Sequence, residues 1–318
     1  MGVTRVAGID CGTNTIRLLV ADVDDAGRLT DVDRRMEVVR LGHGVDRTGR
    51  IAPEALERTL DAARRYGAIC TELGAERIRF VATSASRDAE NRQDFVDGVR
   101  AALGVEPEVI GGDEEARLSF RGATSVLAGR YPGPFLVVDI GGGSTELVLG
   151  TTSPVAAVSM DVGCVRLTER HLHDDPPTAD QIAAASADVV AALRWAAKVV
   201  PFGRAATLVG LAGSVTTVTA HALDLDEYDP QVIDGVVLPI DTVLASCRAL
   251  LTMSHKHRAR LPFMHPGRVD VIGAGALVWS DVITRVRADV GAAGGVLRSV
   301  VTSEHDILDG ITLSAAGR

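Results

Sequence analysis

Several features that mark particular protein classes are scarce or absent in this sequence. The 318-residue chain has four cysteines, and no two of them form a CxxC pair. A zinc site or a disulfide framework built on cysteine is therefore not indicated. No apolar run approaches the roughly 18 residues that a membrane helix needs, and no basic region followed by an apolar one opens the chain. We expect a soluble protein of the cytoplasm that has no membrane partner.

The composition indicates a folded protein with both helices and strands. Hydrophobic residues make up 46% of the chain and aromatic residues only 3%, which is typical of a soluble α/β protein rich in alanine and valine. The length is sufficient for two domains that each bury a core. The net charge of −9 argues against nucleic acid as a partner.

One segment, residues 254–268, has the opposite charge. It holds lysine, arginine and histidine residues and no acid. Two interpretations of this segment stay open: a solvated helix end and loop, or a basic surface that binds a polyanion.

The expected elements occur in the same order twice along the chain. Each half begins with strand-like segments joined by tight turns and continues with alternating helices and strands, which predicts α/β domains with mixed sheets. We expect strands within residues 5–41, 77–83, 105–112, 135–160 and 205–213. We expect helices at about residues 53–74 and 87–103, and within residues 177–200, 241–253 and 268–288. A further helix is expected to begin at a cap formed by Asp113.

Two glycine-containing turns carry the same pattern, Asp-x-Gly-x-x-(Ser/Thr)-x-(charge)-Leu. The stretch VDIGGGSTELVL aligns with IDCGTNTIRLLV at the first hairpin of each half, which indicates a duplication. The aligned pairs are Asp139 with Asp10, Gly141 with Gly12, Ser144 with Thr15, and Glu146 with Arg17. The two hairpins therefore carry opposite charges at one equivalent position.

These turns are candidates for phosphate binding. One turn alone would be explained by the tight geometry that glycine allows. Two such turns, each with an aspartate and a hydroxyl, favour backbone N–H groups that approach a phosphate in a cleft between the domains. The predicted phosphate contacts are Gly12, Thr13, Asn14, Gly141, Gly142, Gly143 and Ser144. The aspartates at the strand ends could hold a divalent cation.

The sequence resembles the exopolyphosphatase and guanosine pentaphosphate phosphohydrolase family, which shares the fold of sugar kinases, Hsp70 and actin. Seven blocks carry the resemblance in the family's order: GIDCGTNTIRLLVAD, ATSASRDAENRQDF, VIGGDEEARL, VVDIGGGSTELVLG, MDVGCVRLTERHLHDDPPT, LAGSVTTV and RVDVIGAGALV. The resemblance implies two ribonuclease-H-like domains with mixed sheets, an interdomain phosphate cleft, and hydrolysis of a terminal phosphoanhydride with Mg²⁺ or Mn²⁺. It also implies a homodimer.

Domain boundaries and functional residues follow from the same resemblance. We expect domains at residues 1–125 and 126–299, and a C-terminal helix within 300–318 that returns to the first domain. The family's catalytic glutamate falls on Glu115, and the acids of its DIGGGSTE block fall on Asp139 and Glu146. The chain stops before the extra C-terminal helical domains of longer relatives, so we do not expect processive hydrolysis of very long polymers.

Helical periodicity selects Glu115 independently of the resemblance. On a helix that begins at Asp113, Glu114 shares a polar face with Arg121, whereas Glu115 shares an apolar face with Leu118. A carboxylate beside apolar groups is partly desolvated and accepts a proton more readily. The alternative is that both glutamates are solvated acids of the first helical turn.

The predicted reaction is in-line attack of a water molecule on a terminal phosphoryl group. Glu115 would activate the water and Glu146 would help to orient it, while Arg17 and Arg87 would contact phosphate oxygens. Arg87 could instead be a surface residue at a helix start. The predicted metal-binding residues are Asp10, Asp139 and Glu146.

Three functions remain open at this point. The first is an exopolyphosphatase that acts on inorganic polyphosphate, with short chains preferred. The second is a phosphohydrolase that converts guanosine pentaphosphate to tetraphosphate. The third is a non-catalytic sensor that binds polyphosphate or the guanosine phosphate.

Overall fold

A computed structural model describes residues 2–317, which form two compact units. Unit 1 contains the chain up to Ser125 and, in addition, the segment from Asp306 onward. Unit 2 is formed by Val126–His305. Unit 1 is therefore discontinuous in sequence, and the chain enters and leaves unit 2 once.

Unit 1 is built on a five-stranded mixed sheet with the strand order β3-β2-β1-β4-β5. The strands are β1 (Val3–Cys11), β2 (Thr15–Asp24), β3 (Leu29–Val38), β4 (Arg77–Ala82) and β5 (Glu108–Val109). The first three form an antiparallel meander, while β4 runs parallel to β1 and β5 runs parallel to β4. The predicted meander is confirmed, and the order is that of a ribonuclease-H-like sheet.

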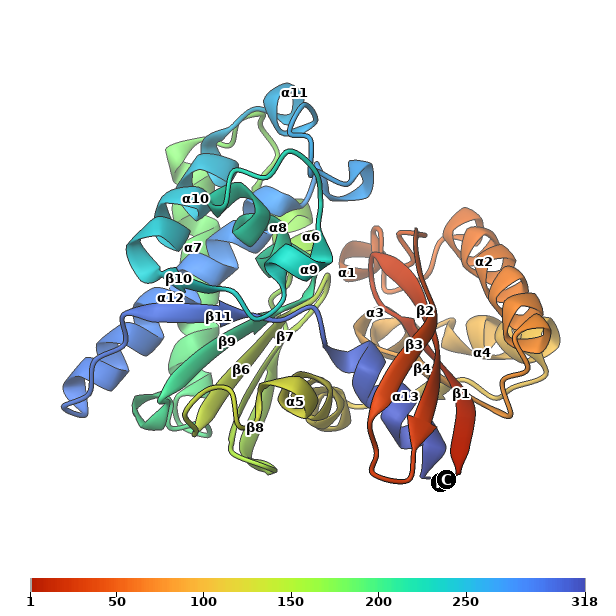
Figure 1. The fold of residues 1–318 in the computed structure, drawn as a ribbon. Helices are drawn as coiled ribbons and strands as arrows, with labels where there is room; N and C mark the ends of the chain where they lie inside the picture. Colours follow the sequence, from red (N-terminus) through yellow and green to blue (C-terminus); the bar gives the residue numbers. More distant parts are fainter. Residues whose placement is uncertain (1, 318) are drawn as a thin grey trace. The chain divides into compact units, whose positions relative to one another are not determined.

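Helices cover both faces of this sheet (Figure 1). On one face, α2 (Pro53–Glu72) and α4 (Arg92–Leu103) bury a cluster that includes Phe80 of β4. On the other face lies α13 (Ile307–Ala316), which buries Leu19 of β2. Two short helices, α1 (Val45–Thr48) and α3 (Ser84–Asp88), lie in the connections.

The helix α5 (Gly112–Leu127) packs against α13 with almost no space between the backbones. A Cβ atom at Gly122 would lie 1.8 Å from the carbonyl oxygen of Asp306, and one at Gly310 would lie 2.0 Å from that of Leu118. Only glycine has no Cβ atom, so this close approach depends on both residues.

Unit 2 repeats the sheet of unit 1 and adds one strand at the edge. Its strand order is β10-β11-β9-β6-β7-β8. The strands are β6 (Phe135–Ile140), β7 (Thr145–Gly150), β8 (Pro154–Met160), β9 (Thr207–Leu211), β10 (Val237–Pro239) and β11 (Ser299–Thr302). Strands β6, β7 and β8 form an antiparallel meander, and β9 and β11 continue in parallel. The predicted fold class, α/β with two mixed sheets, is confirmed.

Four long helices bury one face of the unit 2 sheet around Trp279 (Figure 1). They are α7 (Ala179–Ala196), α8 (Ala212–Ala222), α10 (Ile240–Thr252) and α12 (Ile272–Ala292). The shorter helices of this unit are α6 (Cys164–His171), α9 (Pro230–Ile233) and α11 (His255–Arg258).

Two of the expected helices that carry candidate site residues differ in the structure. The helix expected at residues 87–103 is divided into α3 and α4, because the Asn91 side chain accepts from the N–H of Ile51 and donates to its C=O. These bonds keep residues 89–91, which lie between α3 and α4, out of a helix. Helix α5 begins at Gly112, so Asp113 lies in its first turn and is not its cap.

The C-terminal segment also begins later than expected. Residues 299–302 form β11 of the unit 2 sheet, where Val300 and Val301 are buried. The segment that belongs to unit 1 starts at Asp306, not at residue 300.

The four cysteines are all buried free thiols, in agreement with the absence of paired spacing. None of the helices within residues 2–317 has the length and apolar character needed to cross a membrane.

We predict that Gly122→Ala destabilises the protein strongly. The new methyl group would overlap the carbonyl of Asp306, and the helices must separate or shift, which should cost at least about 2 kcal/mol of unfolding free energy. The control is Gly291→Ala in α12, where nothing lies within 4 Å of a new Cβ atom, and which should be neutral or slightly stabilising. Urea denaturation of both variants is the measurement. Equal stability of the two would contradict the prediction.

Candidate functional site

The loop between β1 and β2 is anchored through its carbonyl groups. The C=O of Thr13 accepts from the N–H of Gly42 at 2.8 Å, and the C=O of Asn14 accepts from the N–H of Arg40 at 2.9 Å. In a trans peptide, the N–H of the next residue points opposite to the carbonyl. The N–H of Asn14 is therefore directed away from the segment that holds the loop.

The loop between β6 and β7 is anchored in the same manner by the start of α6. The hydrogen bonds run from Cys164 N to Gly141 O at 3.0 Å, from Val165 N to Gly142 O at 2.9 Å and from Arg166 Nε to Gly143 O at 2.7 Å. All three carbonyls point toward α6, so the N–H groups of the next residues, Gly142, Gly143 and Ser144, point away from it. A row of N–H groups on one side of a glycine loop is a typical anion-binding arrangement.

Close approach of α6 to this loop depends on one further glycine. A Cβ atom at Gly163 would lie 2.5 Å from the carbonyl oxygen of Gly142. Any larger residue would force the start of α6 away from the carbonyls that it binds.

The duplication extends to the hydrogen bonds of the two hairpins. Gly12 N donates to Thr15 O at 2.9 Å, and Gly141 N donates to Ser144 O at 3.0 Å. The strand registers also agree, because Asp10 lies opposite Arg17 and Asp139 lies opposite Glu146. The alignment made from the sequence therefore describes equivalent positions in space within each unit.

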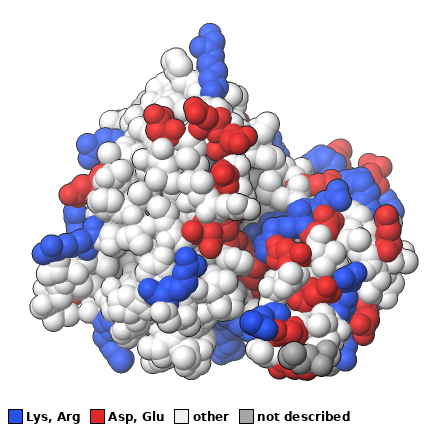
Figure 2. Space-filling view, in the orientation of Figure 1, with Lys and Arg blue, Asp and Glu red and all other residues white. Residues whose placement is uncertain are grey.

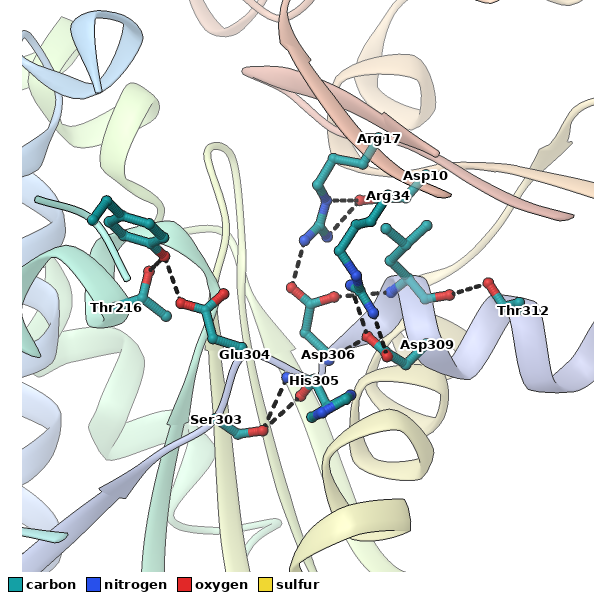
Figure 3. Close-up of polar contacts among 12 residues, drawn as sticks. Asp10, Arg17, Arg34, Thr216, Ser303, Glu304, His305, Asp306, Asp309 and Thr312 are labelled. Carbon is teal, nitrogen blue, oxygen red and sulfur yellow. Dashed lines mark hydrogen bonds and ion pairs between the residues drawn. The ribbon is translucent and has the colours of Figure 1, made fainter. Parts of the chain in front are cut away.

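In unit 1 the opposed pair is an ion pair. Arg17 donates from Nε and Nη2 to Oδ2 of Asp10, at 3.0 and 2.7 Å, and from Nη1 to Asp306 at 2.5 Å (Figure 3). Burial raises the pKa of the Asp10 carboxyl, and Arg17 opposes this shift. Within residues 2–317, no donor reaches the second, buried oxygen of Asp10. Arg17, predicted to contact phosphate, is thus held by two carboxylates.

Acids at the start of α13 fix this helix to the sheet (Figure 3). Asp306 caps the helix by accepting from Leu308 N at 3.0 Å, and its own N–H donates to Asp309 at 3.1 Å. Asp309 also accepts from Arg34 of β3 at 2.7 Å. Each acid therefore binds both the helix end and an arginine of the sheet.

In unit 2 the opposed pair consists of two acids. Asp139 is 5% exposed and Glu146 is 1% exposed. Ser159 of β8 donates to Oε1 of Glu146 at 2.6 Å. Across the described chain, no three His, Cys, Asp or Glu side chains gather closely enough to hold a metal ion by themselves. Of the three predicted metal-binding residues, the structure pairs Asp139 with Glu146.

The predicted catalytic glutamate is buried and bound to an arginine. Glu115 is 7% exposed, and its Oε2 accepts from Arg87 Nη1 at 3.1 Å. Its neighbour Glu114 is half exposed and binds Arg79 instead. The difference in burial expected from helical periodicity is confirmed. Arg87 also donates to the carbonyl of Ile110 at 3.0 Å, so it is not a free surface residue.

A hydroxyl contact connects the first loop to the helix that carries Arg87. The hydroxyls of Thr13 and Ser84 lie 2.8 Å apart, and Ser84 is the first residue of α3. The structure thus brings the loop at residues 12–14, Arg87 and Glu115 together within unit 1.

Sequence reasoning missed four residues that support these groups: Ser84, Ser159, Arg166 and Asp306. Arg166 lies in a block that the sequence did single out, so a role for it could have been suspected. Ser159 needed the register of β8 against β7, and Asp306 lies 289 residues from its partner Arg17. No local pattern marks either contact.

The basic segment at residues 254–268 does not form a continuous basic surface. Arg258 is buried beside Asp175, and His255 pairs with Asp270 at 3.0 Å. The exposed lysine and arginine side chains of this stretch are those of Lys256 and Arg260. Figure 2 shows acidic and basic side chains interleaved over unit 1 and a largely uncharged surface over unit 2 on the visible face.

We predict that Arg17→Met lowers the unfolding free energy by about 3–5 kcal/mol at pH 7.5, because it leaves two buried acids without their cation. Burial raises the pKa of Asp10, so the folded variant takes up protons more readily than the unfolded chain. The difference in unfolding free energy between the variant and the wild type should therefore shrink as the pH falls toward 5. Urea unfolding at both pH values, without divalent cations, is the measurement.

The control is Arg28→Met, which removes the exposed ion pair with Asp24 and should cost less than about 1 kcal/mol. If Arg17→Met loses no more unfolding free energy than this control, or if its loss does not depend on pH, then Arg17 does not stabilise the two buried acids as described.

The comparisons with known proteins agree along nearly the whole chain. The Ppx/GppA phosphatase family pattern matches residues 19–305. Exopolyphosphatase 2 of Mycobacterium tuberculosis (strain ATCC 25618 / H37Rv) is 50% identical over 325 residues, covering 100% of both chains.

Two solved structures are also similar. An exopolyphosphatase-like protein shares 49% identity with a TM-score of 0.96, over 99% of this chain and 98% of that one. The Aquifex aeolicus member of the Ppx/GppA family shares 27% identity with a TM-score of 0.78, over 99% and 98% of the two chains. The chain therefore belongs to the Ppx/GppA phosphatase family.

Proposed function

We propose that the chain is an exopolyphosphatase that hydrolyses the terminal phosphoanhydride of inorganic polyphosphate and releases orthophosphate. The observation that carries the proposal is the second hairpin, where the N–H groups of residues 142–144 point away from α6 beside two buried acids. A full-length relative with 50% identity is an exopolyphosphatase by name, which supports the same substrate class.

Phosphate oxygens would be held by backbone N–H groups. We assign this role to Gly142, Gly143 and Ser144 in unit 2, and to Gly12, Thr13 and Asn14 in unit 1. Backbone donors that are fixed by other hydrogen bonds need little reorganisation when an anion binds, which favours charge stabilisation during the reaction. We also keep Arg17 and Arg87 as phosphate contacts, because each uses only some of its five N–H donors in the bonds described above.

The acid pair Asp139 and Glu146 has the chemistry of a divalent cation site. Like charges directly opposite each other in a sheet are destabilising, and carboxylate oxygens are preferred ligands of Mg²⁺. The buried oxygen of Asp10 that accepts no hydrogen bond is a further oxygen of the same kind. We propose that Asp139 and Glu146 hold Mg²⁺ or Mn²⁺ in unit 2 and that Asp10 serves as a metal ligand in unit 1. The cation would neutralise charge on phosphate oxygens.

Glu115 is the proposed general base. Its contact with Arg87 favours the ionised carboxylate, which is the form that can accept a proton from water. The water oxygen bonds to the terminal phosphorus, the bridging P–O bond breaks, and the shortened chain leaves with the electron pair. The proton passes to Glu115, and Glu146 helps to orient the attacking water.

Guanosine pentaphosphate presents the same type of phosphoanhydride, so it remains a second candidate substrate. A preference for short polyphosphate, a homodimer and a cytoplasmic location stay predictions from the sequence.

We expect that the wild-type protein with Mg²⁺ releases phosphate from polyphosphate and that Glu115→Gln reduces kcat by about 10²- to 10⁴-fold, because the amide cannot accept the proton. Short polyphosphate, long polyphosphate and guanosine pentaphosphate should be assayed in parallel. The matched control is Glu114→Gln, which removes a half-exposed partner of Arg79 and should leave kcat within about twofold of the wild type.

Undiminished hydrolysis by Glu115→Gln would remove Glu115 from the reaction. Tight binding of polyphosphate without hydrolysis of any substrate by the wild type would favour the sensor function. Hydrolysis of guanosine pentaphosphate alone would replace polyphosphate as the substrate.

A further inference from the structure

The duplicated units allow a direct comparison of the side chains that lie across the first three strands. In unit 1 the row contains Asp10 on β1, Arg17 on β2 and Met36 on β3. In unit 2 the equivalent row contains Asp139 on β6, Glu146 on β7 and Ser159 on β8. Where the middle residue is a cation, the third is apolar, and where the middle residue is an acid, the third is a hydroxyl. The two rows thus differ at the third position as well as at the second.

Ser159 is the polar residue of an otherwise apolar strand. The sequence of β8 is PVAAVSM, and its hydroxyl donates to Oε1 of Glu146 at 2.6 Å. Side chains directly opposite each other on neighbouring strands have Cβ atoms about 4.5–5.5 Å apart, so this register places the hydroxyl within reach of the carboxylate.

A single hydrogen bond from a fixed strand position can determine the orientation of a buried carboxylate. Glu146 has several rotatable bonds, and without a donor on β8 its carboxylate could turn away from Asp139 to reduce the repulsion between them. An O–H donor to an ionised carboxylate forms a short, strong bond. The Ser159 hydroxyl therefore opposes this rotation.

We propose that Ser159 is a positioning residue that holds Glu146 in place beside Asp139 for cation binding and for orienting the attacking water. This inference rests on the proposed function, since it assigns a support to a residue of that site. Ser159 itself touches neither the substrate nor the reacting atoms.

The test compares Ser159→Ala, which removes the donor, with Ser159→Thr, which keeps it and suits a strand. The matched control is Ser186→Ala, because Ser186 also donates to a carboxylate in unit 2, that of Asp281 at 2.8 Å. Removal of a group that supports a metal ligand typically costs about 10- to 100-fold in metal affinity or activity. We expect a loss of kcat in this range for Ser159→Ala, with the KM for tripolyphosphate changed less than about threefold, and recovery in Ser159→Thr.

A second readout does not require turnover. Mn²⁺ is titrated into each protein without substrate, and free Mn²⁺ is followed by electron paramagnetic resonance. We expect weaker Mn²⁺ binding in Ser159→Ala, by about 10- to 100-fold, and wild-type binding in Ser159→Thr and Ser186→Ala.

The outcomes separate this inference from the proposed function. A wild-type protein that does not hydrolyse polyphosphate contradicts the proposed function. An active wild type in which Ser159→Ala retains the kcat and the Mn²⁺ affinity of Ser186→Ala contradicts the role of Ser159. Equal losses in Ser159→Ala and Ser159→Thr would also overturn it, because packing rather than the hydroxyl would then matter. Failure of the wild type to bind Mn²⁺ would overturn the part that concerns the cation.

Discussion

The candidate site depends on the hydrogen bonds that hold the carbonyl groups of the two glycine-containing loops. The start of α6 binds the carbonyls of residues 141–143, and the segment after β3 binds those of residues 13 and 14. Because each peptide is planar and trans, fixing its carbonyl also fixes the direction of the following N–H. Glycine permits this close anchoring at Gly163, where a side chain would overlap the loop. The direction of the N–H groups that we propose to bind phosphate is therefore a consequence of how the loops are attached.

The two units share this loop geometry but differ in charge at one position of the following strand. Arg17 neutralises Asp10 and connects it to Asp306 at the start of α13. Glu146 instead places a second acid opposite Asp139 and receives a hydrogen bond from Ser159. The unit 1 row contains an ion pair, whereas we propose that the acids of the unit 2 row bind a cation. This charge difference between duplicated hairpins is the basis for proposing different roles for them.

Local patterns were sufficient to predict the meanders, the duplication and the burial of Glu115, because each depends on residues close together in the sequence. The family and the fold class were also predicted correctly. The division of the helix at residues 87–103 could not be predicted, since it depends on a contact between Asn91 and Ile51. The same holds for the partners of Arg17 and Glu146, which are set by strand register and by the return of α13. The roles of the individual site residues remain predictions.

Amide resonances report directly on whether the N–H groups of the second loop bind phosphate. ¹⁵N-labelled Glu115→Gln protein, chosen to prevent turnover, is titrated with tripolyphosphate in the presence of Mg²⁺. We predict saturable downfield shifts of the Gly142, Gly143 and Ser144 amide protons, since these would donate hydrogen bonds to anionic oxygens. Binding of tripolyphosphate that leaves these three resonances unchanged would show that the second loop does not bind phosphate through these N–H groups.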